Sequence, residues 1–377
     1  MTPLTVFFCG TSSTKFDSEN KSYWNGELVS TLAKHNLGKE FAEWIVVDGP
    51  GSGNLQADEQ FFKSGHYGIS GTLLGSGWEE NVKHALQIAK GHCSWERTEL
   101  TQQEYNRLKD AGAPIGDLEK AGTWFWRKYY YGKRIVTPQQ LQEQIIKMHR
   151  KGKLPTAVNL VGWSRGAVSC HMMANQMLKD DELKNIPVNI FAIDPVPGPK
   201  NFQAERVTLG SNVKEYVGFF ARDERSVGFS CVIPRTDSKT RTHIYPMAGR
   251  HATLVGNAAA NGNDNAGAKD LTEPGLIVRH FAEVCLTRWG VNLDKKLNLS
   301  KADLDNHHNS LKSKDEQYKK MQKVSYTYFT DLDQGERKVS HGNEGTAFSK
   351  VQGGHMKPAS GLSASLTLTA TSYQEIG

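Results

Sequence analysis

The hydrophobic residues of this chain gather in short runs that are separated by polar segments. Six runs rich in β-branched and aromatic residues, each followed within two residues by Gly or Asp, predict buried strands. They cover residues 4–9, 44–47, 157–161, 188–193, 215–221 and 243–247. Apolar residues at helical spacing predict helices over residues 78–89, 138–150, 166–178 and 275–289. Strands that alternate with helices predict an α/β fold, with a mostly parallel sheet covered by helices on both faces.

Several segments fall outside this alternation and suggest a division of the chain. The predicted parts are a core over 1–290, an inserted cap or lid over 91–136, a peripheral helical segment over 291–335 and a C-terminal tail over 336–377. The insertion is polar but rich in aromatic residues. The tail is rich in Gly, Ser and Thr, which predicts either a flexible arm or a short terminal strand at Leu362, Leu366 and Leu368.

A Gly-Trp-Ser-Arg-Gly pentapeptide at residues 162–166 lies between a predicted strand and a predicted helix. Two glycines allow a tight strand-to-helix turn, which would lift the hydroxyl of Ser164 above the edge of the sheet. The N-terminus of the following helix favours developing negative charge at this position. The context predicts that Ser164 is a nucleophile; the alternative is a structural serine in a tight turn.

A serine nucleophile requires a base and an acid, and in this motif's usual order both follow the serine in the chain. His251 is the favoured base, because it follows the last predicted strand through a loop that can return to the strand ends. His280 lies inside a predicted helix and His243 begins a strand, so both are weaker candidates. Asp194 and Asp223 each end a predicted strand; we favour Asp194 as the acid and keep Asp223 as the alternative.

An oxyanion hole needs two backbone N–H groups, one of which normally comes from the residue after the nucleophile. That residue is Arg165. The second donor is expected from the loop after the first strand, at Gly10 or Thr11. A plain strand-ending turn is the alternative interpretation of this loop.

Composition narrows the class of protein. The 377 residues are 38% hydrophobic and 23% charged, a globular balance that excludes disorder, collagen and coiled coil as the main state. The formal net charge of +6 is spread along the chain, so no nucleic-acid partner is expected. The five cysteines lie far apart without a CxxC pair, and no metal or other cofactor is expected.

The N-terminal residues lack the pattern of a signal peptide, and no apolar run is long enough for a membrane-spanning helix. We therefore expect a protein made in the cytoplasm, with any export following a leaderless route. Contact with a membrane would be peripheral.

Three stretches resemble the α/β-hydrolase lipases, and among them the type VI secretion phospholipase effectors and related uncharacterised bacterial hydrolases. Val-Phe-Phe-Cys-Gly-Thr at 6–11 is similar to the family's opening strand and turn, although Cys9 stands where the family usually has Asp. Gly-Trp-Ser-Arg-Gly-Ala at 162–167 resembles its nucleophile elbow, and residues 249–256 resemble its histidine loop. The three stretches span about two-thirds of the chain.

This resemblance implies an α/β-hydrolase fold and a serine hydrolase that cleaves a carboxylic ester through an acyl-enzyme. Ser164 would be the nucleophile, His251 the base and Asp194 the acid. It further implies a lipase or phospholipase that acts as a secreted bacterial effector or toxin on lipid or another acyl ester. An antibacterial effector would also need an immunity protein as a partner.

Trp124, Trp126 and Tyr130 lie in the predicted cap beside basic residues, which predicts contact with substrate and with a lipid surface. The alternative is that these aromatic residues pack the insertion onto the core. Two further functions are compatible with the sequence. One is a soluble esterase, thioesterase or peptidase with the same triad, and the other is a non-catalytic toxin or binding module that keeps the fold.

Overall fold

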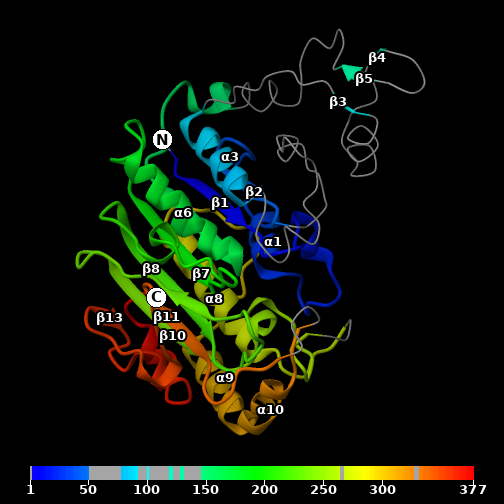
Figure 1. Cartoon of the computed structure of the whole chain (residues 1–377), viewed down its shortest axis with the longest axis vertical. Coiled ribbons are helices and arrows are strands. Elements are labelled where there is room, and N and C mark those ends of the chain that lie inside the picture. Colours follow the sequence, from blue (N-terminus) through cyan, green and yellow to red (C-terminus); the bar gives the residue numbers. More distant parts are fainter. Residues whose placement is uncertain are drawn as a thin grey trace.

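A computed structural model describes residues 2–50, 78–91, 100–101, 119–121, 128–130, 146–263, 267–326 and 331–377 of the chain (Figure 1). Its centre is a seven-stranded sheet in which every neighbouring pair of strands is parallel. Across the sheet the order is β13 (Met356–Lys357), β10 (Arg241–Met247), β8 (Val213–Ala221), β7 (Val188–Ile193), β6 (Val158–Trp163), β1 (Leu4–Phe8) and β2 (Trp44–Val47). The predicted α/β fold and all six predicted strands are confirmed.

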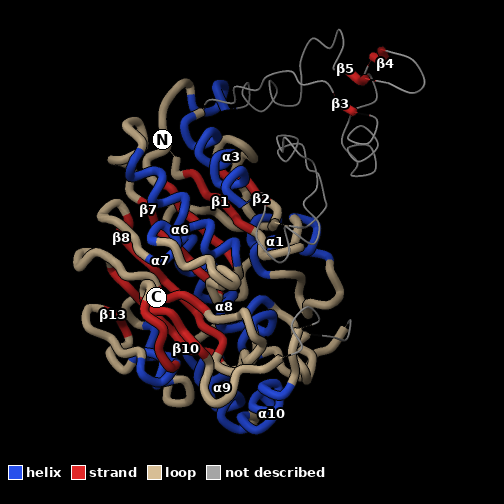
Figure 2. Tube along the Cα trace, in the orientation of Figure 1, coloured by secondary structure: helices blue, strands red, loops and turns tan. Residues whose placement is uncertain are grey.

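Helices cover both faces of this sheet, as the alternation of side chains in β1 demonstrates. Leu4, Val6 and Phe8 pack into one hydrophobic cluster with α3 (Trp78–Lys90) and α6 (Arg165–Lys179). Phe7 packs into a second cluster with α1 (Leu28–Lys34) and α8 (Glu273–Arg288). Figure 2 shows α3 and α6 crossing over the strands. Successive residues of a strand point to opposite faces, so a strand that is apolar throughout requires cover on both sides.

Three of the four predicted helices are confirmed as α3, α6 and α8. Most of the fourth, predicted over 138–150, lies outside the described residues. The charged segment after residue 300 forms α9 (Lys301–Ser313) and α10 (Asp315–Lys320). Leu304, Leu311 and Tyr318 of these two helices are buried in the same cluster as α8. Within the described part of the chain, no helix is long and apolar enough to cross a membrane.

Smaller elements complete the fold. One three-stranded sheet has the order β12 (Glu344–Ala347), β11 (Lys338–His341) and β9 (Cys231–Ile233), and another has β3 (Leu100–Thr101), β5 (Lys128–Tyr130) and β4 (Glu119–Ala121). Short helices are α7 (Ala204–Val207) and the 3-10 helices Lys15–Glu19, His251–Val255, Met321–Lys323, Phe348–Lys350, Gly361–Ala364 and Ala370–Tyr373. Of the predicted cap, Trp124 and Trp126 lie outside the described residues, and Tyr130 is the last residue of β5. The cap stays a prediction.

The C-terminal segment 336–377 differs from both expectations for it. It is neither a free arm nor a strand at Leu362, which is buried within the 3-10 helix Gly361–Ala364. Instead, β13 extends the main sheet beside β10, and β11 pairs with β9. Tyr373 and Ile376 are buried against the face that carries α8. The apolar anchors occur singly among small polar residues, so no helical or strand period reveals this packing.

Candidate active site

The residues singled out by the sequence converge at one edge of the main sheet. All seven strands are parallel, so their carboxyl ends lie at the same edge, where ligands of open α/β sheets normally bind. Ser164 follows β6, Asp194 follows β7, and His251 follows β10 after a short loop. The loop with Gly10 and Thr11 follows β1. The fold therefore brings these four segments to the same edge of the sheet, although they are far apart in the sequence.

Ser164 occupies a strained turn between β6 and α6, with φ 60° and ψ −127°. A non-glycine residue in this conformation is costly and persists only where the surroundings enforce it. A Cβ atom at Gly162 would lie 2.4 Å from the carbonyl carbon of Gly166, and one at Gly166 would lie 2.2 Å from the carbonyl oxygen of Phe8. Both glycines are therefore required for α6 to start this close to the sheet.

We expect Gly166→Ala to lower the free energy of unfolding by about 3 kcal/mol or more, because the new methyl group meets backbone rather than a movable side chain. Urea unfolding followed by circular dichroism measures this change. Gly345→Ala in β12 is the matched control, since a Cβ atom there meets nothing within 4 Å. Equal stability of the two variants would contradict a close backbone contact at Gly166.

Asp194 and His251 are joined by a short hydrogen bond, with 2.6 Å between Oδ2 and Nδ1. Both side chains are buried. The imidazole also packs against the ring of Trp163, the residue before Ser164, with 5.1 Å between ring centroids and an interplanar angle of 34°. The backbone N–H of Ser164 donates to the carbonyl of Ile193, the residue before Asp194, at 3.0 Å. The structure thus places Asp194 and His251 in direct contact, and Ser164 next to residues that contact them. The catalytic roles of the three residues stay a prediction.

The carboxylate of Asp194 is held by a residue that sequence analysis did not single out. Arg337 forms a bidentate ion pair with this carboxylate, at 2.5 Å from Nη1 to Oδ1 and 2.8 Å from Nη2 to Oδ2. Burial alone would raise the pKa of Asp194, but the Arg337 charge and the hydrogen bond and charge of His251 lower that pKa to about 2. The carboxylate is therefore ionised at neutral pH and can accept the Nδ1–H of His251, which leaves Nε2 as the basic nitrogen.

The alternative acid, Asp223, has different partners. Its carboxylate accepts hydrogen bonds from Arg222, from Gln322 and from the backbone N–H of Gly249, the last at 2.8 Å. Asp223 therefore fastens the loop that leads to the histidine, while the imidazole of His251 is bonded to Asp194. The two weaker base candidates lie elsewhere. His280 accepts from the backbone N–H of Leu299, and His243 lies 3.7 Å from Glu215 at the start of the neighbouring strand.

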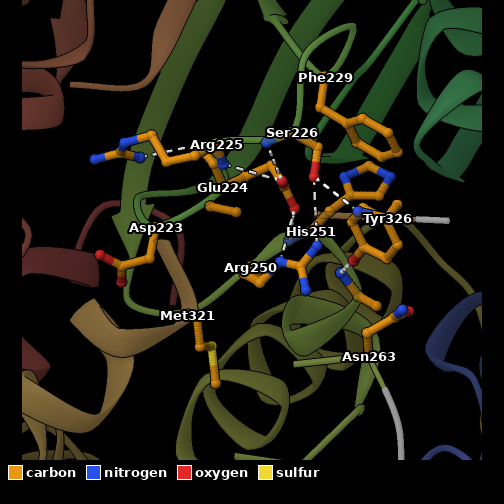
Figure 3. Close-up of polar contacts among 12 residues, drawn as sticks. Asp223, Glu224, Arg225, Ser226, Phe229, Arg250, His251, Asn263, Met321 and Tyr326 are labelled. Carbon is orange, nitrogen blue, oxygen red and sulfur yellow. Dashed lines mark hydrogen bonds and ion pairs between the residues drawn. The ribbon is translucent and has the colours of Figure 1, made fainter. Parts of the chain in front are cut away.

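A second polar cluster, also missed from the sequence, fixes the histidine loop (Figure 3). The buried carboxylate of Glu224 accepts from the backbone N–H of His251 at 3.3 Å and from Nε of Arg250 at 3.4 Å. The guanidinium of Arg250 lies over the ring of Tyr326, 4.1 Å from its centroid. Phe229 meets the imidazole edge-on, with 5.2 Å between centroids. These contacts restrict the orientation of the His251 ring.

The loop after β1 is packed against the elbow, where an oxyanion hole was predicted. A Cβ atom at Gly10 would lie 2.4 Å from the ring of Trp163, so only glycine fits there. The hydroxyl of Thr11 accepts from Nη1 of Arg165 at 3.0 Å. In the part of the chain that the structure describes, the backbone N–H of Thr11 has no acceptor. Arg165 is the first residue of α6, so its N–H lies at the positive end of the helix dipole.

The side chain of Arg165 is itself buried, and burial together with the charge of Arg206 lowers its pKa to about 10.

Among the described residues, no group of three or more His, Cys, Asp or Glu side chains could hold a metal ion. Four described cysteines, Cys9, Cys170, Cys231 and Cys285, are buried free thiols.

In a comparison with known proteins, no family model and no curated protein matches this chain. It is similar to an uncharacterized protein from Pseudomonas aeruginosa, with 14% identity and a TM-score of 0.41, over 78% of this chain and 46% of that one. It is also similar to the Tle1 effector, whose structure was determined bound to the VgrG spike of the Type 6 secretion system. That match has 13% identity and a TM-score of 0.30, over 68% of this chain and 51% of the effector chain. This chain spans about half the length of either structure.

Proposed function

We propose that this protein is a serine-dependent hydrolase of carboxylic esters that works through an acyl-enzyme. The observation that supports this most strongly is the 2.6 Å hydrogen bond between buried Asp194 and His251 beside the strained Ser164. Backbone strain is typical of nucleophile elbows. A plain structural turn would need neither the strain nor an oriented imidazole next to it.

In this mechanism the Oγ atom of Ser164 attacks the acyl carbonyl carbon while its proton passes to Nε2 of His251. Asp194 holds the Nδ1–H and stabilises the imidazolium. The N–H groups of Arg165 and Thr11 are the proposed donors to the oxyanion, and Gly10 permits that loop to approach. Collapse of the tetrahedral intermediate breaks the ester C–O bond, and the leaving alcohol takes the proton from Nε2. Water, deprotonated by the same nitrogen, then hydrolyses the acyl-enzyme.

The resemblance of the three sequence stretches to lipases makes phospholipids the first substrates to test. We propose an exported effector whose cap residues Trp124, Trp126 and Tyr130 contact lipid, with an immunity protein as its partner in the producing cell. A panel of anionic and zwitterionic phospholipid vesicles, compared with a short soluble ester, separates a lipase from a soluble esterase. A higher rate on vesicles favours the lipase, and a rate confined to the soluble ester favours the esterase.

Covalent labelling with a fluorophosphonate tests the hydrolase proposal before any substrate is known. Only a serine activated by a neighbouring base reacts readily with this probe. We expect one adduct per chain, located by mass spectrometry on the peptide that contains Ser164, and strongly reduced labelling in His251→Ala. Wild-type protein that stays unlabelled both with and without detergent would contradict the proposal.

A further inference from the structure

We infer that Arg337 is a positioning residue of this active site. Its guanidinium fixes the orientation of the proposed triad acid, Asp194, and balances the negative charge next to His251. This inference rests on the proposed function of Ser164, Asp194 and His251. It concerns a side chain from the C-terminal segment, 143 residues after the acid that it binds.

The acceptor positions of Asp194 are fully used. An ionised carboxylate has about four lone-pair positions. On Oδ1 they are filled by Nη1 of Arg337 and by the backbone N–H of Ala221, the latter at 3.0 Å. On Oδ2 they are filled by Nη2 of Arg337 and by Nδ1 of His251. The carboxylate therefore cannot rotate without losing a bond, and the position left for the imidazole is fixed.

Nη1 and Nη2 of Arg337 make four hydrogen bonds, while Nε has no partner among the described residues. Arg337 is 1% exposed, and its Nη1 and Nη2 also donate to the carbonyl oxygens of Ala221 and Phe229, at 2.5 and 2.9 Å. Burying a charge is costly unless it is paired and hydrogen-bonded. The Arg337 guanidinium thus bonds Ala221 at the end of β8, the carboxylate of Asp194, and Phe229, whose ring packs against His251.

The C-terminal segment delivers this side chain. Arg337 immediately precedes β11, which pairs in parallel with β9 at Val339 and Cys231. The carbonyl of Arg337 accepts from the backbone N–H of Phe348 at 3.1 Å, which closes the hairpin of β11 and β12 behind it. The position of the guanidinium thus depends on this hairpin.

The charge of Arg337 also acts on the imidazole through the acid. The titratable and charged groups that face His251 from the packed elements are Asp194, Glu224, Arg250, Tyr326 and Arg337. Arg337 balances the charge of Asp194, so the imidazolium meets a neutral pair rather than a lone anion. Without the cation, the imidazole would meet a lone anion, which favours its protonated and inactive form, so we expect the acid limb of the rate profile to move to higher pH.

The test compares Arg337→Met, Arg337→Lys and the control Arg288→Met in the full chain. Arg288 also makes a bidentate pair with a buried carboxylate, that of Glu215, at 2.8 and 2.7 Å. This pair lies at the opposite end of β8, and the Arg288 side chain is more exposed than that of Arg337. The readouts are kcat, KM and the pH profile of kcat/KM on a p-nitrophenyl ester. We expect Arg337→Met to lower kcat about 10- to 100-fold at similar KM, as loss of an orienting partner typically does. We also expect the acid limb of the kcat/KM profile to shift to higher pH by about one unit.

Arg337→Lys keeps the charge but not the planar fork, so the acid limb should stay near its wild-type position while kcat remains low. Arg288→Met should change neither quantity. The inference is overturned if folded Arg337→Met has the wild-type kcat and profile, or if its loss is matched by Arg288→Met without movement of the limb. Should Arg337→Met not fold, an unchanged kcat in Arg337→Lys overturns it equally.

Proton NMR separates this inference from the proposed function. A strong hydrogen bond places the Nδ1 proton of His251 far downfield, and the signal is assigned by its absence in His251→Ala. We expect Arg337→Lys and Arg337→Met to shift or broaden this resonance and Arg288→Met to leave it unchanged. If the wild-type protein has no esterase activity but shows this Arg337-dependent signal, the proposed hydrolase function is rejected while the positioning role of Arg337 is kept. If the resonance is unchanged in both Arg337 variants, the positioning role of Arg337 is rejected.

Discussion

Ser164→Ala should lower kcat for ester hydrolysis by about 10⁶-fold, the loss found when the nucleophile of a serine triad is removed. The expectation follows from the position of Ser164 at the start of α6, directly after Trp163, whose ring packs against the imidazole of His251. Without the hydroxyl no acyl-enzyme forms, and only the oxyanion donors and substrate binding contribute to any remaining rate. Steady-state hydrolysis of a p-nitrophenyl ester measures the change.

Ser169→Ala is the matched control for this variant, because Ser169 is a buried serine on the same helix. Its hydroxyl accepts from Nε1 of Trp78 at 2.5 Å and donates to the carbonyl of Arg165 at 3.1 Å. Its loss should cost about 1 to 3 kcal/mol of stability and leave kcat within about twofold of wild type. A Ser164→Ala protein that keeps more than a small fraction of the activity would assign the nucleophile to another residue.

The second large effect is expected for Asp194→Asn, which should lower kcat by about 10⁴-fold. An amide in place of the carboxylate can present N–H to the imidazole and thereby favour the wrong tautomer, with the proton on Nε2. The variant also leaves the buried guanidinium of Arg337 without its counter-ion, so stability falls as well. The comparison must therefore use kcat of protein shown to be folded by near-UV circular dichroism.

Asp223→Asn distinguishes the two candidate acids. Asp223 bonds Arg222 and the backbone N–H of Gly249, so its loss should loosen the histidine loop and lower kcat by no more than about tenfold. If Asp223→Asn costs more than Asp194→Asn, Asp223 is the acid and the observed pairing of Asp194 with His251 is not the catalytic one.

The part of this fold that sequence alone predicts is the part with local signals. The six predicted strands carry apolar residues on both faces over most of their length, so each stands out as a run, whereas the two-residue β13 does not. The glycines around Ser164 are needed for contacts close in space to the turn itself. His251 could be preferred over His280 because a loop after a parallel strand lies at the carboxyl edge of the sheet, whereas His280 lies within α8.

The remainder of the site depends on contacts between distant residues. Arg337 lies in a polar stretch that carries no periodicity, and nothing near it in sequence indicates a buried carboxylate partner. Glu224 is flanked by Asp223 and Arg225, which makes it resemble a solvated surface charge, yet it is buried under the histidine loop. A buried ion pair is recognised only when both partners are placed, which requires the tertiary structure.

The long separation between Asp194 and Arg337 has a consequence for biosynthesis. During translation the serine, the acid and the histidine all leave the ribosome before Arg337 is added, and 143 residues separate the acid from its cation. Until that residue emerges, Asp194 lacks the counter-ion that pairs with it in the folded protein. The pairing of Asp194 with its cation is therefore completed late in synthesis, after β6, β7, β8 and β10 are already available to pair.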